Sequence, residues 1–139
     1  MREIKFRAWD TKDKMMYEEV VGIDFYNGVL DMHPDYLCKV SMRDCVLMQF
    51  TGRYDKNGKE IYEGDYLSYN IAGNRREVAI VIQDKFGWTF ELLNDGFYGD
   101  IETPIIRDKW KHIDHCEVIG NIYENPELAK GESCEPISG

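Results

Sequence analysis

The sequence predicts a mainly-β protein with an N-terminal hairpin region, an SH3-like small β-barrel and a short C-terminal helix. Short segments of β-favouring residues alternate with turn residues at close spacing. No stretch keeps apolar residues at helical spacing over four turns. The 139 residues suffice for one compact domain, or for a small domain with an appended piece.

The first fifty residues are predicted to form hairpins. Residues 4–8 alternate apolar and basic side chains, which is typical of a half-buried strand, and extended segments follow at 15–17 and 20–25. Asn27-Gly28 lies between β-favouring residues. This dipeptide predicts a type I′ turn, which needs positive φ at both central positions.

The predicted barrel begins near residue 52. A strand over 45–50 ends at Thr51-Gly52, and a second Asn-Gly turn follows within 55–59. We therefore expect an N-terminal β-hairpin region at 1–51, an SH3-like barrel at 52–130 and a loose tail at 131–139.

The later elements of the barrel follow from the same signals. Asn125 as N-cap and Pro126 at the first helical position predict the short helix. The remaining strands are expected at 66–69, 77–83, 88–92 and 113–119.

The formal net charge of −9 is unevenly distributed. Residues 1–52 carry a net −2, residues 53–90 are neutral, and residues 91–139 carry a net −7. The longest basic cluster is the pair Arg75-Arg76, which disfavours direct nucleic-acid binding. The acidic final third either keeps the protein soluble or imitates nucleic-acid phosphates toward a basic partner.

The longest apolar runs, 45–48 and 78–82, are far shorter than the ~20 residues that cross a bilayer. The N-terminus has no apolar stretch of signal-peptide length. We therefore expect no membrane association and a cytoplasmic protein, with its four cysteines reduced.

The three residues His112, His115 and Cys116 are the best candidates for a metal site. If 112–119 is a strand, however, His115 points to the opposite face from the other two. We expect no metal and no cofactor, and we expect Cys45 and Cys116 to act as small buried hydrophobes.

The sequence offers no catalytic constellation. It lacks a Gly-x-Ser-x-Gly elbow and a phosphate-binding loop of the Gly-x-x-x-x-Gly-Lys type, and it has only three histidines. We expect no enzyme activity; a metal-dependent enzyme such as a nuclease is the alternative, and needs convergent carboxylates.

Aromatic and acidic residues near the expected loops are the candidate binding residues. Trp88 and Phe90 share one face of a strand and are expected to fill the core. Partly exposed aromatic residues and the acidic group around them form the candidate binding set: Tyr98, Trp110, Asp95, Asp100, Glu102 and Asp108.

Four blocks of the sequence resemble the YopX family of phage and prophage proteins. They are residues 2–10 (REIKFRAWD), 47–52 (LMQFTG), 55–65 (DKNGKEIYEGD) and 117–128 (EVIGNIYENPEL). The resemblance implies an origin in temperate phages and prophages of Gram-positive bacteria and a β-rich fold with an SH3-like part. It implies no catalytic residues. We interpret the Gly, Asn and Asp residues of these blocks as architectural, because tight turns require them.

These observations favour a non-catalytic binding module. The N-terminal hairpins have too little core to stand alone, so they either dock on the barrel or pair with another subunit. We expect a homo-oligomer and a host or phage partner with a basic surface. An effector that mimics DNA with its acidic face is the alternative.

Overall fold

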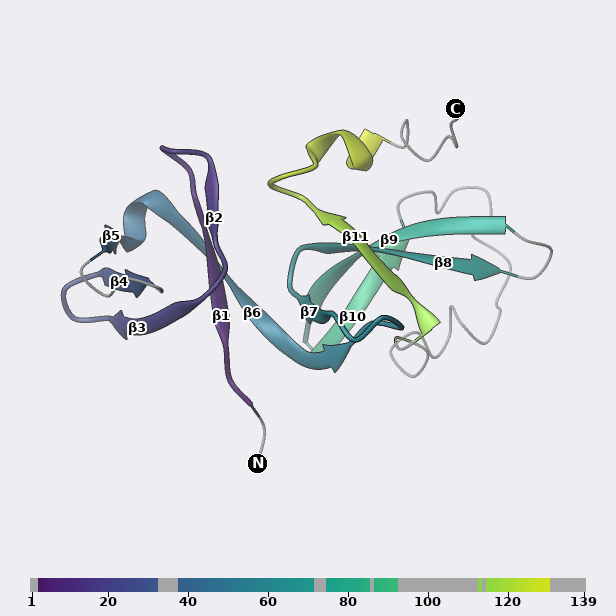
Figure 1. Cartoon of the computed structure of the whole chain (residues 1–139), viewed down its shortest axis with the longest axis horizontal. Helices are drawn as coiled ribbons and strands as arrows, with labels where there is room; N and C mark the ends of the chain where they lie inside the picture. The colour runs from purple at the N-terminus through teal and green to yellow at the C-terminus, as the bar shows by residue number, and fades with distance from the viewer. Residues whose placement is uncertain are drawn as a thin grey trace. The chain divides into compact units, whose positions relative to one another are not determined.

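The computed structural model of the chain describes residues 3–32, 38–71, 75–85, 87–92, 113 and 115–130. It is mainly β, so the predicted fold class is confirmed. The chain divides into two compact units, Met1–Gly52 and Arg53–Gly139 (Figure 1). In the described part, no helix is both long enough and apolar enough to span a bilayer.

The first sheet of the N-terminal unit is built around β1 (Phe6–Asp10). On one side β1 pairs antiparallel with β2 (Met15–Tyr17), and on the other with β6 (Cys45–Tyr54). The order is β2-β1-β6 followed by β7 (Glu60–Tyr62), so β2 is an edge strand.

The second sheet of this unit is a three-stranded antiparallel meander. It consists of β3 (Val20–Asp24), β4 (Val29–Met32) and β5 (Lys39–Ser41), and a 3-10 turn, η1 (Met42–Asp44), follows. A register shift at Val21 leaves this residue bulged out of the β3–β4 ladder.

The core of this unit is small. Its buried apolar residues in the described part are Met48, Phe50 and a cluster of Ala8, Leu30 and Met32. A larger set of partly buried apolar residues packs around this cluster: Tyr17, Val20, Ile23, Cys38, Val40, Met42, Cys45 and Leu47.

Two sequence predictions for this unit are wrong. The strand over 45–50 does not end at Thr51-Gly52, because Gly52 adopts a φ of +89° inside β6 and the strand continues to Tyr54. The turn at Asn27-Gly28 is not type I′, since Gly28 has a φ of +68° but Asn27 has none of the positive φ that this turn needs. The loop instead spans four residues between β3 and β4.

The C-terminal unit contains a curled four-stranded antiparallel sheet in the order β10-β9-β8-β11, which forms half a barrel. Its strands are β8 (Asp65–Ile71), β9 (Arg75–Asp84), β10 (Gly87–Leu92) and β11 (Glu117–Asn121), and β7 (Glu60–Tyr62) precedes them.

Apolar side chains of this sheet form a continuous core. As predicted, Phe90 is fully buried and Trp88 packs against the same cluster. The other buried members are Ile61, Leu67, Tyr69, Ala79, Val81, Ile113 and Cys116.

The last strand lies further along the chain than predicted. Residues Ile113 and His115 are in a 3-10 conformation, the N–H of Cys116 donates to the Ile113 carbonyl at 3.1 Å, and β11 begins at Glu117. The predicted C-terminal helix is a 3-10 helix, η3 (Pro126–Lys130), and the Leu128 N–H donates to the Asn125 carbonyl at 3.0 Å.

Candidate functional site

The loop between β3 and β4 presents two adjacent aromatic side chains to solvent. Phe25 is 76% exposed and Tyr26 is 96% exposed. Aromatic side chains have only two χ angles, so they lose little conformational entropy on binding, and tyrosine is enriched at binding hot spots. We call Phe25 and Tyr26 the aromatic tip.

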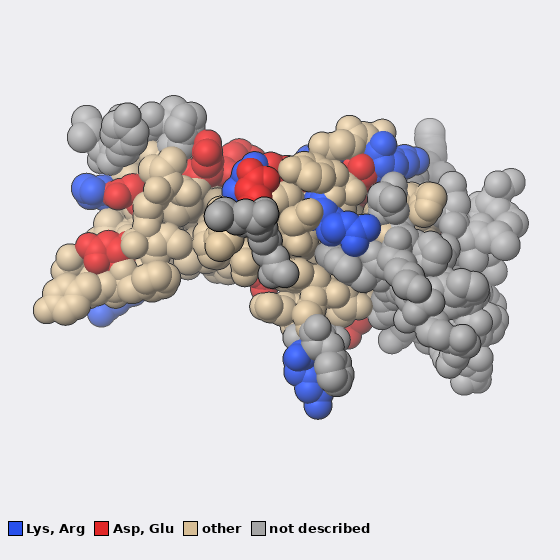
Figure 2. Space-filling model, turned by 90° about the horizontal axis from the view of Figure 1, so that it is seen from below, with Lys and Arg blue, Asp and Glu red and all other residues tan. Residues whose placement is uncertain are grey.

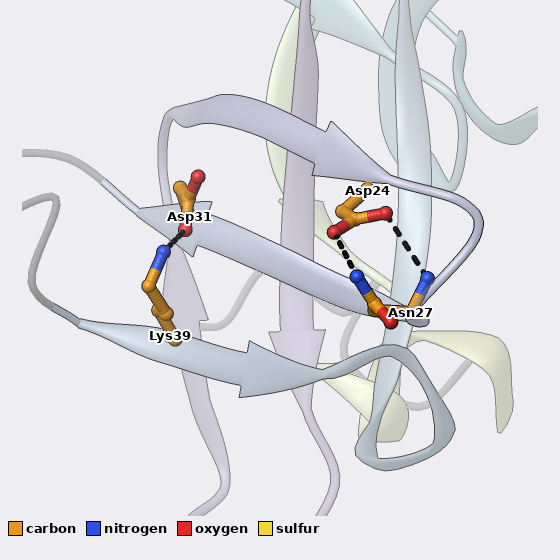
Figure 3. A network of polar contacts seen from close by, with 4 residues as sticks. All are labelled: Asp24, Asn27, Asp31 and Lys39. Atoms are coloured by element: carbon orange, nitrogen blue, oxygen red, sulfur yellow. Dashed lines mark hydrogen bonds and ion pairs between the residues drawn. The ribbon is translucent and has the colours of Figure 1, made fainter.

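Hydrogen bonds within the loop hold the aromatic tip in one conformation. The two carboxylate oxygens of Asp24 accept from Asn27, one from the backbone N–H at 3.0 Å and the other from the side-chain amide at 2.8 Å (Figure 3). The Gly28 N–H donates to the Asp24 carbonyl at 2.8 Å, and the Gly28 carbonyl accepts from Met42 N–H at 2.8 Å. The loop is therefore organised before any partner arrives.

These hydrogen bonds also perturb the carboxyl group of Asp24. The bond from the Asn27 side chain lowers the pKa of Asp24 below its ordinary value of 3.8, and the bond from the Asn27 backbone adds to the effect. The carboxylate therefore keeps its charge to a lower pH than an ordinary aspartate does.

A second polar contact joins the neighbouring strands of this sheet. Lys39 Nζ lies 2.6 Å from Asp31 Oδ1, linking β5 to β4 (Figure 3). On the other side of Asp31, a Cβ added to Gly22 would lie 2.9 Å from Asp31 Oδ2. The absence of a side chain at Gly22 therefore leaves room for the carboxylate.

In the C-terminal unit, Asp55 is used for structure. Asp55 is buried, and its Oδ1 accepts from the N–H groups of Asn57 and Lys59, both at 2.8 Å. Its Oδ2 accepts from the Val118 N–H at 2.9 Å, across 63 residues of sequence. The carboxylate joins the turn to β11.

Other residues in the predicted turn motifs have similar roles. Asp65 Oδ2 accepts from the Tyr62 N–H at 2.8 Å. Asn121 Oδ1 accepts from the N–H groups of Tyr123 and Glu124, at 3.0 and 2.8 Å. These contacts agree with the architectural interpretation of the motifs.

The candidate binding residues chosen from the sequence lie outside the described residues. They are Tyr98, Trp110, Asp95, Asp100, Glu102 and Asp108. The aromatic tip is not among them, because the extended pattern over 20–25 predicts that Phe25 lies in a strand. One signal in the sequence does point to Phe25 and Tyr26: they directly precede Asn27-Gly28, and the residues next to an Asn-Gly turn lie at the end of a hairpin.

The metal hypothesis concerned His112, which lies outside the described residues, together with His115 and Cys116. His115 is exposed, whereas Cys116 is 1% exposed and belongs to the core. The described ranges contain no group of three His, Cys, Asp or Glu side chains that could hold a metal ion. The strand expected over 112–119 is not found at Ile113 and His115, which are in a 3-10 conformation.

The described surface carries charges of both signs. On the face shown in Figure 2, acidic and basic side chains occur in small groups separated by uncharged residues. The predicted acidic set lies outside the described ranges, so its position on the surface is not described.

Together these features define a mainly-β protein of two compact units whose turn carboxylates serve the fold. The chain belongs to the YopX family: the family model for the YopX protein matches residues 5–130, which confirms the resemblance seen in the sequence. The crystal structure of protein EF1440 from Enterococcus faecalis is similar, with a TM-score of 0.67 and 29% identity. That similarity covers 93% of this chain and 99% of the other. A search of curated proteins finds no match.

Proposed function

We propose that this protein is a non-catalytic binding module of the bacterial cytoplasm, which uses the aromatic tip to contact a host or phage protein and also self-associates. The observation that carries the binding role is the exposure of Phe25 and Tyr26 on a loop organised by Asp24 and Asn27. Adjacent exposed aromatic side chains offer apolar area that a partner can remove from water, and a preorganised loop lowers the entropic cost of that contact.

The chemistry of the tip restricts the partner. Asp24 is charged at neutral pH and lies beside the aromatic residues. A complementary surface therefore combines an apolar pocket for Phe25 or Tyr26 with a lysine or arginine at its edge.

The support for self-association is the small core of the N-terminal unit. In the described part of this unit five apolar side chains are buried, whereas the eight apolar side chains that pack against Ala8, Leu30 and Met32 are only partly buried. Pairing with another copy would remove more of this apolar surface from water.

An affinity capture from host cells tests the binding role. The wild-type protein is compared with Phe25→Ser/Tyr26→Ser and with Val21→Ser, an exposed apolar residue of β3 that serves as the matched control. We expect a protein that the wild type and the control both retain and that the double variant loses. Equal capture by all three proteins would contradict the assignment of the tip.

Light scattering tests self-association separately. We expect a mass above that of the 16.3 kDa chain. A single 16.3 kDa species at all concentrations would remove this half of the proposal without touching the role of the tip.

A further inference from the structure

We propose that Asn57 is a site of spontaneous deamidation, and that the Asp24 carboxylate protects Asn27 from the same reaction. Asn27-Gly28 and Asn57-Gly58 are the two Asn-Gly pairs of the sequence. Asparagine is a thermolabile residue, and a glycine after it leaves the next backbone nitrogen unhindered. Neither site depends on the binding role proposed above.

The reaction consumes water and releases ammonia. The backbone nitrogen of the glycine attacks Cγ of the asparagine, the Cγ–Nδ2 bond breaks, and Nδ2 leaves as ammonia with the proton of the glycine N–H. Water then opens the cyclic succinimide at either of its carbonyl groups, which gives aspartate or isoaspartate, and no atom is oxidised or reduced. The side chain must therefore be free to turn Cγ toward the glycine nitrogen before the first step.

Hydrogen bonds hold the side chain of Asn27 in place. Its Nδ2 donates to Asp24 Oδ2 at 2.8 Å, and its backbone N–H donates to Asp24 Oδ1 at 3.0 Å (Figure 3). Gly28 is fixed as well, because its N–H donates to the Asp24 carbonyl and its carbonyl accepts from the Met42 N–H, both at 2.8 Å. Attack on Cγ of Asn27 therefore requires the bond from Nδ2 to break first.

The side chain of Asn57 is not held in this way. Its backbone N–H donates to Asp55 Oδ1 at 2.8 Å, and the Gly58 N–H donates to the Asp55 carbonyl at 3.0 Å, so the backbone around the two asparagines is held similarly. Within the part of the chain that the structure describes, no hydrogen bond is found to the side-chain amide of Asn57. A Cβ placed on Gly58 would meet open space, so nothing crowds the attacking nitrogen.

Solvent access and charge do not distinguish the two sites. Asn27 and Asn57 are both exposed. Each also lies beside an aspartate whose carboxylate accepts from its backbone N–H, so a negative charge opposes the loss of the glycine proton at both sites. The hydrogen bond from Nδ2 is therefore the feature that separates Asn27 from Asn57.

Protection of Asn27 preserves the loop that carries the aromatic tip. Deamidation there would replace the donating amide with a carboxylate, remove the 2.8 Å contact with Asp24 Oδ2 and set two like charges side by side. At Asn57 the product also adds a charge, but the described part of the turn has no side-chain contact of this residue to lose.

Peptide mapping by mass spectrometry measures both rates in one sample of the full chain, incubated in mildly alkaline buffer. We expect Asn57 to deamidate about three- to tenfold faster than Asn27, because breaking one typical hydrogen bond before the reaction lowers a rate by about this factor. In guanidinium chloride the two rates should become similar, since the unfolded chain lacks the contact. Equal rates in the folded chain, or a difference that persists in the unfolded chain, would overturn the proposal.

Asp24→Ala tests the role of the carboxylate. Asn27 should then deamidate at nearly the rate of Asn57, which serves as the internal reference in the same sample. The matched control is Asp31→Ala, because Asp31 lies on the neighbouring strand β4 and pairs with Lys39. This control should leave the rate at Asn27 unchanged. An unchanged rate at Asn27 in Asp24→Ala, or an equal increase in Asp31→Ala, would refute protection by Asp24.

Discussion

Replacing Asp55 should destabilise the C-terminal unit more than any other single change to a turn residue described above. Its carboxylate accepts three backbone N–H groups at 2.8 to 2.9 Å, and the residue is 5% exposed. Removing an acceptor from a buried donor costs about 1 to 3 kcal/mol.

The magnitude follows from where each donor lies. The N–H groups of Asn57 and Lys59 belong to exposed turn residues, so water replaces much of each bond and each loss costs about 0.5 to 1 kcal/mol. The Val118 N–H lies in β11 and loses about 1.5 kcal/mol. Asp55→Ala should therefore cost about 3 kcal/mol in the free energy of unfolding.

Urea denaturation followed by circular dichroism measures this cost. With a slope of about 2 kcal/mol per molar urea, the midpoint for Asp55→Ala should fall by about 1.5 M. Asp55→Asn should fall by less, since its one carbonyl oxygen still accepts from the turn while its NH2 group faces the Val118 donor.

Asp24→Ala is the matched control, because Asp24 caps a comparable turn from a fully exposed position. Its midpoint should move clearly less than that of Asp55→Ala. The reasoning would be refuted if Asp55→Ala shifted the midpoint by no more than about 0.3 M. Faster amide exchange at Val118 in Asp55→Ala would locate the lost contact.

Three further changes have defined outcomes. Gly120→Ala should lower stability by about 1 to 3 kcal/mol in thermal unfolding, because the new Cβ would lie 2.8 Å from Asn125 Cγ; an unchanged midpoint would contradict this. Burial, and after it two nearby carboxylates, raise the pKa of Cys45 to about 11, so its alkylation at pH 8 should be about a hundredfold slower than that of an ordinary thiol. Peptide mapping measures this rate, and alkylation of the folded protein at the rate of the unfolded chain would contradict the prediction. Asn27→Ala should raise the pKa of Asp24 toward 3.8 in an NMR titration. In the wild type, the ionised Asp24 accepts the loop hydrogen bonds at any pH above 3.8, and their stabilising effect is lost as the pH falls through the lowered pKa of the folded protein.

The turns and short strands could be predicted because their signals are local. Asp55, Gly58 and Asn121 are residue types that favour tight turns, and the structure places each of them in or beside one. Asn125 and Pro126 likewise start the short helix where the sequence predicts it, although the helix is of the 3-10 type.

The errors arise where distant residues decide the conformation. The sequence predicts a strand over 113–119 whose apolar part is Val118-Ile119, but the Lys56 N–H donates to the Cys116 carbonyl at 2.9 Å and β11 starts only at Glu117. Nothing in the local sequence reveals that contact.

The aromatic tip was missed for a related reason. An Asn-Gly pair predicts a two-residue turn, whereas the Asp24 carboxylate stabilises a four-residue loop. The longer loop takes Phe25 out of the strand and into solvent. One side chain therefore decides whether this aromatic residue belongs to the fold or to the surface.

The pairing of β11 with β8 has a consequence for synthesis on the ribosome. The strands of the first unit, apart from the end of β6, lie within the first 52 residues and are translated early. In the second unit, β8 (Asp65–Ile71) can pair with β11 (Glu117–Asn121) only after about fifty more residues have been translated. Until then, one edge of the growing second sheet has no partner strand, and such long-range pairing is slow. During synthesis the first unit can therefore pair β1 with β6 before β8 of the second unit can pair with β11.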